Sequence, residues 1–89
     1  MNKIKNYSLI YIRNKIIELF FKVTHIDKLE ISDEMLIREE LGIDSLMAME
    51  ILAKIEKSYD ITINEEEVFK LKTIGEFIEY VWRLINKKQ

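Results

Sequence analysis

The residues best suited to do chemistry lie in one short stretch, Leu41-Gly42-Ile43-Asp44-Ser45-Leu46. Gly42 can adopt a positive φ angle and close a turn, and Asp44 is a good N-cap for the amphipathic run that follows it. Ser45 is therefore expected on the first turn of a helix. Free backbone N–H groups and the positive end of the helix dipole favour an anion there, such as a phosphodiester. An ordinary helix start that pairs Asp with Ser would show the same residues. The rest of the chain must therefore decide between such a helix start and a functional site at Ser45.

Composition excludes several other kinds of site. The 89 residues carry a net charge of −2, whereas nucleic-acid binders are usually basic, so we expect no nucleic-acid partner. The chain has no Cys and a single histidine, His25, which excludes disulfides, zinc-thiolate sites and multi-histidine metal sites. Its apolar runs are too short to span a bilayer, and its N-terminus lacks the uninterrupted apolar segment of a signal peptide. We expect a cytoplasmic monomer with no metal and no stable membrane insertion.

The first element predicted to position this stretch is a helix from Ser8, its cap, to about Thr24. Arg13 lies inside the apolar stripe of this helix. Its methylene groups can lie along apolar surface while its guanidinium reaches water. The stripe is wide enough for a broad core, which we favour, or for an additional contact with a partner. Its members at helical spacing are Leu9, Ile12, Ile16, Leu19, Phe20 and Val23, widened by Ile10, Ile17 and Phe21.

Residues 25–40 have no sustained period and are predicted to form a long loop. Structured loops of this length are uncommon in small domains and suggest a function. Ser32-Asp33-Glu34 could start a single helical turn. The apolar residues expected to anchor the loop to the core are Leu29, Ile31, Leu36, Ile37 and Leu41.

The helix predicted from Ser45 to Tyr59 has two apolar sides. The side expected in the core contains Ala48, Ile51, Leu52, Ile55 and Tyr59. The smaller strip contains Leu46, Met49 and Ala53, flanked by Glu50, Glu56 and Lys57. Scattered surface apolar residues are normal, but the position directly after Ser45 favours a docking surface with an apolar centre and a charged rim.

The remaining sequence predicts an extended connector, a short helix and a closing helix. Residues 60–63 are the connector, and Asn64 with Glu67 matches a capping box before one or two turns through Leu71. A second capping box, 73–76, opens the last helix, whose apolar stripe is Ile74, Phe77, Ile78, Val81, Leu84 and Ile85.

Together these elements predict an all-α domain. We expect a small four-helix bundle of three longer helices and one short helix, with a long loop between the first and second helices. The domain is expected to span residues 8–86, between flexible termini at 1–7 and 87–89.

In helix order and motifs the chain resembles acyl carrier proteins, from about Leu9 to Ile85. Those proteins have a long first helix, a long loop ending in a modified serine, a second helix, a short third helix and a closing fourth. The matching residues are Leu41-Gly42, Asp44-Ser45-Leu46, Glu50, Glu56, Asp60-Ile61-Thr62-Ile63, Glu65–Glu67 and Thr73-Ile74-Gly75.

The resemblance implies that Ser45 carries 4′-phosphopantetheine, with Asp44 and Leu46 completing the cofactor motif. A phosphopantetheinyl transferase would transfer this group, the arm, from coenzyme A. An acyl chain would then be attached to the terminal thiol of the arm as a thioester. The other implied partners are acyl-loading and acyl-processing enzymes of the ketosynthase, acyltransferase or ligase type. No general base is needed near Ser45, and His25 is far away in sequence, so the chain is interpreted as a carrier rather than an enzyme.

Departures from the family pattern favour a specialised pathway of polyketide or secondary-metabolite type over generic fatty-acid synthesis. Fatty-acid carriers usually have an acidic residue where Met47 stands, and Lys54 and Lys57 dilute the acidic character of the second helix. The partner-binding residues are expected to be Leu46, Met47, Met49, Glu50, Ala53, Glu56 and Lys57.

Other carriers remain as alternatives. Peptidyl carriers generally show Gly-Gly-His/Asp-Ser, which Gly42-Ile43-Asp44 does not match. D-alanyl carriers share features resembling Ile55-Glu56 and Tyr59-Asp60-Ile61 but typically lack the Leu-Gly pair. An unmodified helical protein-interaction module is the alternative from a different class.

A further expectation is that the bundle shelters part of the acyl chain between its helices. The expectation depends on flexible or branched apolar residues near the arm, namely Leu46, Leu52, Ile55, Ile74 and Phe77.

Overall fold

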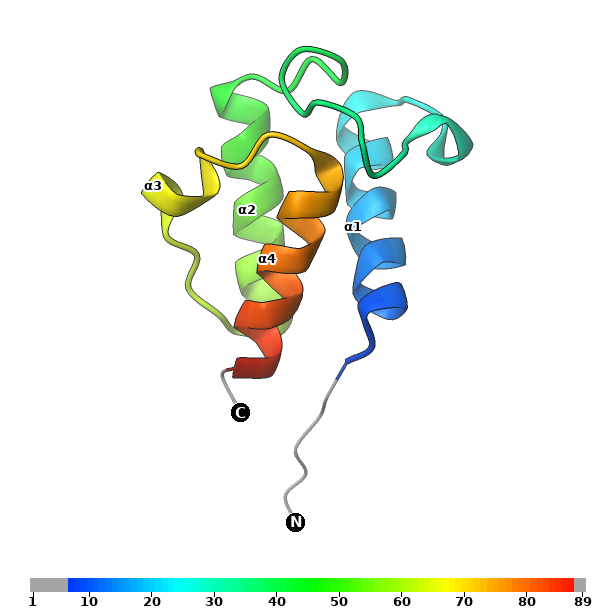
Figure 1. Cartoon of the computed structure of the whole chain (residues 1–89). Coiled ribbons are helices and arrows are strands. Elements are labelled where there is room, and N and C mark those ends of the chain that lie inside the picture. Colours follow the sequence, from blue (N-terminus) through cyan, green and yellow to red (C-terminus); the bar gives the residue numbers. More distant parts are fainter. Residues whose placement is uncertain (1–6, 88–89) are drawn as a thin grey trace.

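The computed structural model describes residues 7–87, and within this range it confirms an all-α bundle (Figure 1). The chain forms α1 (Leu9–Thr24), a short 3-10 helix η1 (Lys28–Glu30), α2 (Ser45–Tyr59), α3 (Glu65–Val68) and α4 (Ile74–Lys87). The helix boundaries predicted for α1 and α2 are confirmed. The predicted short helix is confirmed too, although α3 itself ends at Val68 and only turns continue towards Leu71.

Side-chain caps fix where the helices begin. The Ser8 hydroxyl accepts a hydrogen bond from the Tyr11 amide at 3.1 Å. Asn64 Oδ1 accepts one from the Glu67 amide at 2.9 Å, which caps α3. At α4 the box is reciprocal: the Glu76 amide donates to Thr73 Oγ1, while Glu76 Oε1 accepts from the Lys72 and Thr73 amides. The capping box predicted at α4 therefore forms in full. At α3 only the Asn64 half forms, because the Glu67 carboxylate accepts from the Tyr80 hydroxyl instead.

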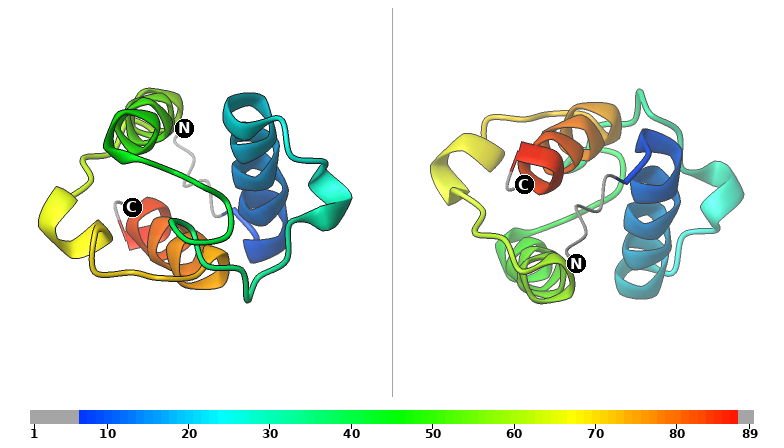
Figure 2. Two further views of the ribbon diagram at one scale, coloured as in Figure 1. Left: turned by 90° about the horizontal axis from the view of Figure 1, so that it is seen from above. Right: turned by 90° about the horizontal axis from the view of Figure 1, so that it is seen from below.

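The core lies where α1, α2 and α4 meet, as the views along the helices show (Figure 2). Phe20 of α1 and Phe77 of α4 meet edge to face, with ring centroids 5.8 Å apart. The best-buried side chains are Ile12, Ile16 and Phe20 from α1, Ile51 and Ile55 from α2, and Ile74 and Val81 from α4. Every one of them belongs to an apolar face predicted from the helical spacing.

Four residues expected in the core, Leu9, Ile10, Phe21 and Leu29, are on the surface. Leu29 is 94% exposed because η1 lies on the outer side of α1, away from α2 and α4 (Figure 2). Leu9 is 42% exposed because it is the first residue of α1, at the end of the bundle where few side chains cover it. Of the residues said to widen the stripe, Ile17 is buried, whereas Ile10 and Phe21 are exposed.

The long loop between α1 and α2 is anchored mainly by Ile31 and Leu41, both buried. The single turn expected at Ser32 forms, since the Ser32 carbonyl accepts from the Met35 amide at 3.2 Å, but it does not extend into a helix. The 3-10 helix η1 lies upstream of it and was not predicted; the Asp27 carboxylate caps η1 by accepting from the Leu29 amide. Asp33 has another partner, since its carboxylate lies 2.9 Å from Arg13 of α1.

The loop is also joined to the start of α4. The Ile37 amide donates to the Lys72 carbonyl at 2.9 Å, and the Gly75 amide donates to the Asp33 carbonyl at 2.8 Å. A Cβ atom at position 75 would lie 3.2 Å from that carbonyl oxygen, so glycine suits this close approach. These two bonds therefore hold the middle of the loop, at Asp33 and Ile37, against the start of α4.

The expected flexible termini lie mostly outside the described residues, with two exceptions. Tyr7 is held to α4, because its carbonyl accepts from Trp82 Nε1 at 2.8 Å and its amide donates to Asn86 Oδ1. Lys87 is the last residue of α4. Within residues 7–87, no helix is both long enough and apolar enough to cross a membrane.

Candidate functional site

Ser45 is the first residue of α2, and a tight turn delivers it there. Gly42 has a φ of 68°, and its amide donates to the Arg38 carbonyl at 3.1 Å. On either side of Gly42, Leu41 and Ile43 are buried and pin the turn to the core. The predicted role of Gly42 as the turn residue is confirmed by its positive φ.

Asp44 caps α2 in the way that its sequence position predicts. Its carboxylate accepts a hydrogen bond from the Met47 amide at 2.8 Å, and its carbonyl accepts from the Ala48 amide. In the described part of the chain, the amides of Ser45 and Leu46 donate to no other group. Two free N–H groups at a helix N-terminus suit a phosphodiester attached to the exposed Ser45 hydroxyl.

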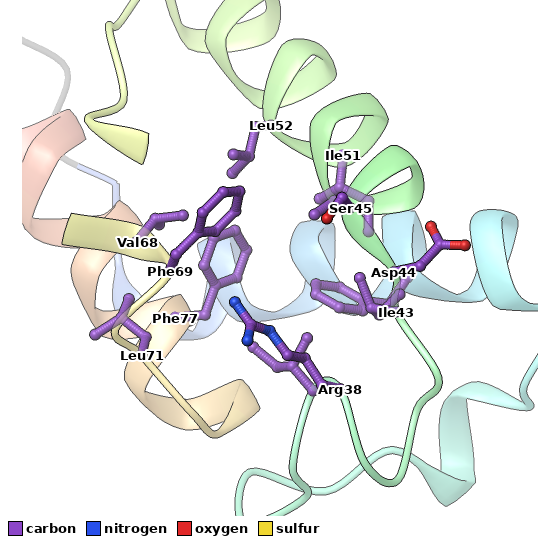
Figure 3. A pocket seen from close by; sticks show the side chains of 13 residues that line it. Arg38, Ile43, Asp44, Ser45, Ile51, Leu52, Val68, Phe69, Leu71 and Phe77 are labelled. Atoms are coloured by element: carbon purple, nitrogen blue, oxygen red, sulfur yellow. The ribbon is translucent and has the colours of Figure 1, made fainter. Parts of the chain in front are cut away.

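A cavity of about 330 Å³ opens beside Ser45 (Figure 3). Ser45 and Asp44 lie on its rim, and its walls come from all four helices, the loop before α2 and the segment that follows α3. The apolar side chains lining it are Phe20, Ile37, Ile43, Ala48, Ile51, Leu52, Val68, Phe69, Leu71 and Phe77. The lining includes no histidine, and its one carboxylate, that of Asp44, accepts a hydrogen bond from the Met47 amide.

Of the five residues expected to shelter an acyl chain, two line this cavity, namely Leu52 and Phe77. Ile55 and Ile74 are fully buried elsewhere in the core, and Leu46 points outward. The sequence placed all five near the arm because helical spacing gives the face of a helix but not its depth in the bundle.

Arg38 and Phe69 are the residues at this cavity that the sequence analysis missed. The Arg38 side chain extends from the loop towards Phe69, and its guanidinium carbon lies 5.8 Å from the Phe69 ring centroid (Figure 3). Phe69 caps the C-terminal end of α3 and is partly exposed. The only sequence signal was an exposed aromatic residue directly after the acidic run of α3.

The expected partner surface on α2 is open to solvent at its centre. Leu46 is 80% exposed and Met49 is 41% exposed, while Ala53, Glu50 and Lys57 are exposed around them; Met47 is half-buried. Two large apolar side chains on the outside of a helix, next to the attachment residue, match the predicted apolar centre.

Glu56 is already engaged within the protein. Its carboxylate accepts a hydrogen bond from the Ile63 amide at 2.7 Å, and the Ile61 amide donates to its carbonyl. Glu56 is also half-buried. We therefore attribute to it the holding of the 60–63 connector, a role that the sequence analysis did not separate from partner binding.

A metal-binding cluster is not found among the residues that the structure describes. In the range 7–87 no three His, Asp or Glu side chains gather closely enough to hold a metal ion. The expected absence of a metal site stays a prediction for the chain as a whole.

Comparison with known protein families gives one match that covers most of the chain. Residues 14–81 match the family model described as the phosphopantetheine attachment site. The match includes Ser45, the turn before it and the core-forming parts of all four helices.

Curated relatives agree with the family model. An acyl carrier protein of Exiguobacterium is 40% identical over 55 residues, which cover 62% of this chain and 70% of that protein. An acyl carrier protein of Cyanophora paradoxa is 31% identical over 77 residues, covering 86% and 75%. The meromycolate extension acyl carrier protein of Mycobacterium leprae is 35% identical over 69 residues, covering 78% and 60%.

A solved structure has the same fold. The HMG-ACPI domain from the CurA module of Lyngbya majuscula superposes with a TM-score of 0.77, covering 99% of this chain and 89% of that one. The two are 18% identical, so this likeness concerns the fold alone.

Proposed function

Because this chain belongs to the acyl carrier proteins, we propose that Ser45 is the residue to which its 4′-phosphopantetheine is attached. Acyl carrier proteins are carriers rather than enzymes, and phosphopantetheine is their prosthetic group. When bound, the group supplies a thiol that holds an acyl chain as a thioester. The observation that carries the assignment is the position of Ser45: an exposed hydroxyl on the first turn of α2, beside two free backbone amides.

The residues around Ser45 support attachment in complementary ways. The amides of Ser45 and Leu46 can donate to phosphate oxygens, and the N-terminus of α2 adds a favourable partial charge. Asp44 is occupied by the Met47 amide and therefore holds the helix start in place. The exposed hydroxyl leaves room for the active site of a phosphopantetheinyl transferase, which supplies the catalytic groups.

Intact mass after incubation with coenzyme A and a phosphopantetheinyl transferase tests the assignment. We expect the protein to gain the mass of one phosphopantetheine group and Ser45→Ala to gain none. Ser58→Ala is the matched control, because Ser58 is an exposed serine on the same helix. Modification that persists in Ser45→Ala, or that disappears in Ser58→Ala, would contradict the assignment.

Stability separates this function from a purely structural role of Ser45. Since Asp44 provides the cap, Ser45→Ala should change the free energy of unfolding by no more than about 1 kcal/mol. A large loss of helicity in Ser45→Ala would favour an ordinary helix start, as an unmodified interaction module would have.

We further propose that the carrier serves a specialised pathway of polyketide or secondary-metabolite type. The support is the mixed charge of α2, where Lys54 and Lys57 are exposed and Met47 replaces an acidic residue. A partner that binds through a basic patch would be attracted only weakly by the mixed charges of α2. We expect Lys57→Glu to be a better substrate than the parent protein for a generic fatty-acid synthase enzyme and a poorer one for the native partner.

Acylation rates of the two proteins by a fatty-acid synthase acyltransferase test the pathway. Equal rates would remove the main support for a specialised pathway and favour fatty-acid synthesis. Aminoacyl, peptidyl and D-alanyl carriers stay alternatives, distinguished by whether the loaded arm accepts an amino acid from an adenylating ligase.

A further inference from the structure

A groove of about 310 Å³ lies between α1 and α2, and Lys57 is the one lining residue that it shares with the partner surface expected around Met49. We call it the lysine groove, because Lys15 and Lys22 of α1 face Lys54 and Lys57 of α2 across it. Glu18 is the one carboxylate among its lining residues. The groove thus has a net charge of +3 on a protein whose total charge is −2.

The four ammonium groups are available to a ligand. All four lysines are exposed. The ion pairs within residues 7–87 are Arg13 with Asp33 and Arg83 with Glu79, so none of the four lysines is paired with a carboxylate. Lys15 has one weak interaction, with its Nζ 5.7 Å from the Tyr11 ring centroid. Four cations along one groove with no carboxylate paired to them repel one another, and an anionic partner would relieve that repulsion.

The bottom of the groove is apolar. Ile16 and Ile55 are buried beneath it, and Leu19 is half-buried at its edge. Tyr59 closes one end, and burial, together with the neighbouring Tyr11 and Tyr7 rings, raises the pKa of its hydroxyl, which therefore stays a neutral donor. A ligand that fits must combine negative charge with an apolar group.

We propose that the lysine groove is a docking site for a carboxylate-rich segment of a partner protein. Acidic side chains of the segment pair with the lysines. One apolar side chain, between the acidic ones, contacts the apolar bottom of the groove. The proposal rests on the carrier function proposed above, because it identifies the chemistry of a partner that the carrier meets.

A protein partner fits the groove better than other polyanions do. The groove is concave, so a side chain that protrudes from a folded surface can enter it, whereas a membrane presents a flat surface. Nucleic acid would be repelled by the net negative charge of the rest of the chain. Lys54 also lies nine residues after Ser45, about 14 Å along α2, so a partner held there reaches the helix that presents the attachment residue.

The experiment titrates the protein with two blocked peptides, Glu-Glu-Leu-Glu-Glu and its Gln-Gln-Leu-Gln-Gln control, while NMR follows amide shifts. We expect the glutamate peptide to shift resonances of Ile16, Leu19 and Ile55, and the glutamine peptide to leave them unchanged. Binding should weaken with salt, as expected for exposed charges.

Charge-reversal variants locate the site. The double variant Lys15→Glu/Lys54→Glu should weaken peptide binding about 10-fold, because it replaces two attractions with two repulsions. Its matched control, Lys70→Glu/Lys87→Glu, makes the same change in net charge at exposed lysines outside the groove and should change binding less than about twofold. Equal weakening by both variants would overturn the proposal, since only net charge would then matter.

Two further measurements exclude other occupants. Tighter binding to phosphatidylglycerol vesicles than to the glutamate peptide would overturn the proposal in favour of a membrane surface. Equal binding of the two peptides would overturn it in favour of a purely apolar contact. Ser45→Ala should bind the peptide as the parent protein does, so failure of the arm assignment and failure of the groove are seen separately.

Discussion

Lengthening the acyl chain on the arm should raise the stability of the bundle, because the cavity beside Ser45 can take up methylene groups. The cavity of about 330 Å³ already exists, and ten of its lining side chains are apolar. Each methylene removed from water contributes about 0.8 kcal/mol, so the change from a butanoyl to an octanoyl thioester contributes up to about 3 kcal/mol. For a domain of this size, that upper bound corresponds to a rise in Tm of about 12–24 °C.

The assay is thermal unfolding, followed by circular dichroism, of protein loaded with butanoyl, hexanoyl or octanoyl groups. Ala48→Leu is the informative variant, because Ala48 lines the cavity and a larger side chain would fill part of it. Ala53→Leu is the matched control, with the same change on the exposed side of the same helix. We expect Tm to rise with chain length in the parent protein and in Ala53→Leu, and the rise to be smaller in Ala48→Leu.

Two results would refute this reasoning. A Tm that does not depend on chain length would mean that the chain stays in solvent or in the partner. The same slope in Ala48→Leu and in the parent protein would mean that the chain is buried somewhere other than this cavity.

Three further predictions concern docking, capping and pH. Met49→Ala should weaken a cognate partner more than Glu50→Gln does, since an apolar anchor buried on binding can outweigh an exposed charge pair, and Glu50 is exposed beside Met49; binding constants at two ionic strengths test this, and a larger loss in Glu50→Gln would indicate electrostatic docking. Asp44→Ala should cost about 1 kcal/mol in the free energy of unfolding, measured by urea denaturation, and no loss would mean that the cap is dispensable. Two backbone amides hold the pKa of Glu76 below its ordinary value of 4.5, so its stabilising effect is present above that pH and is lost as the pH falls through the lower native pKa. Thermal unfolding from pH 7 to pH 3 should therefore show less acid sensitivity in Glu76→Gln than in the parent protein, and equal sensitivity would contradict this role.

The helices and their caps could be predicted because each depends on residues close together in sequence. Ser8, Asn64 and Thr73 bond to amides three residues away, and Gly42 needs only its own backbone freedom. The loop was predicted less well. Leu29 and Ile31 are both apolar, but only the path of η1 over α1 decides that the first is exposed and the second buried.

The candidate site could likewise be predicted only where it depends on residues close together in sequence. The position of Ser45 on a helix start follows from its immediate neighbours, but the contact between Arg38 and Phe69 joins segments 31 residues apart and leaves no periodic signal. The lysine groove could not be predicted either, because it depends on how α1 and α2 are turned about their axes, and tertiary packing decides that. Charges that looked like a dilution of the acidic second helix are, in three dimensions, one side of a cationic groove.

The buried side of α2 explains how one helix can serve several encounters. Ile51 and Ile55 are packed in the core and fix the rotation of the helix. With that rotation, Met49 lies on the outer surface and Lys54 lies beside α1, while Ser45 stays exposed at the N-terminal end. Successive residues differ by about 100° around the helix axis, so a slip of one position would move all three groups away from their present surroundings. The apolar core residues of α2 are therefore the physical reason that Ser45, Met49 and Lys54 face different surroundings, while Lys57 belongs to both proposed docking surfaces.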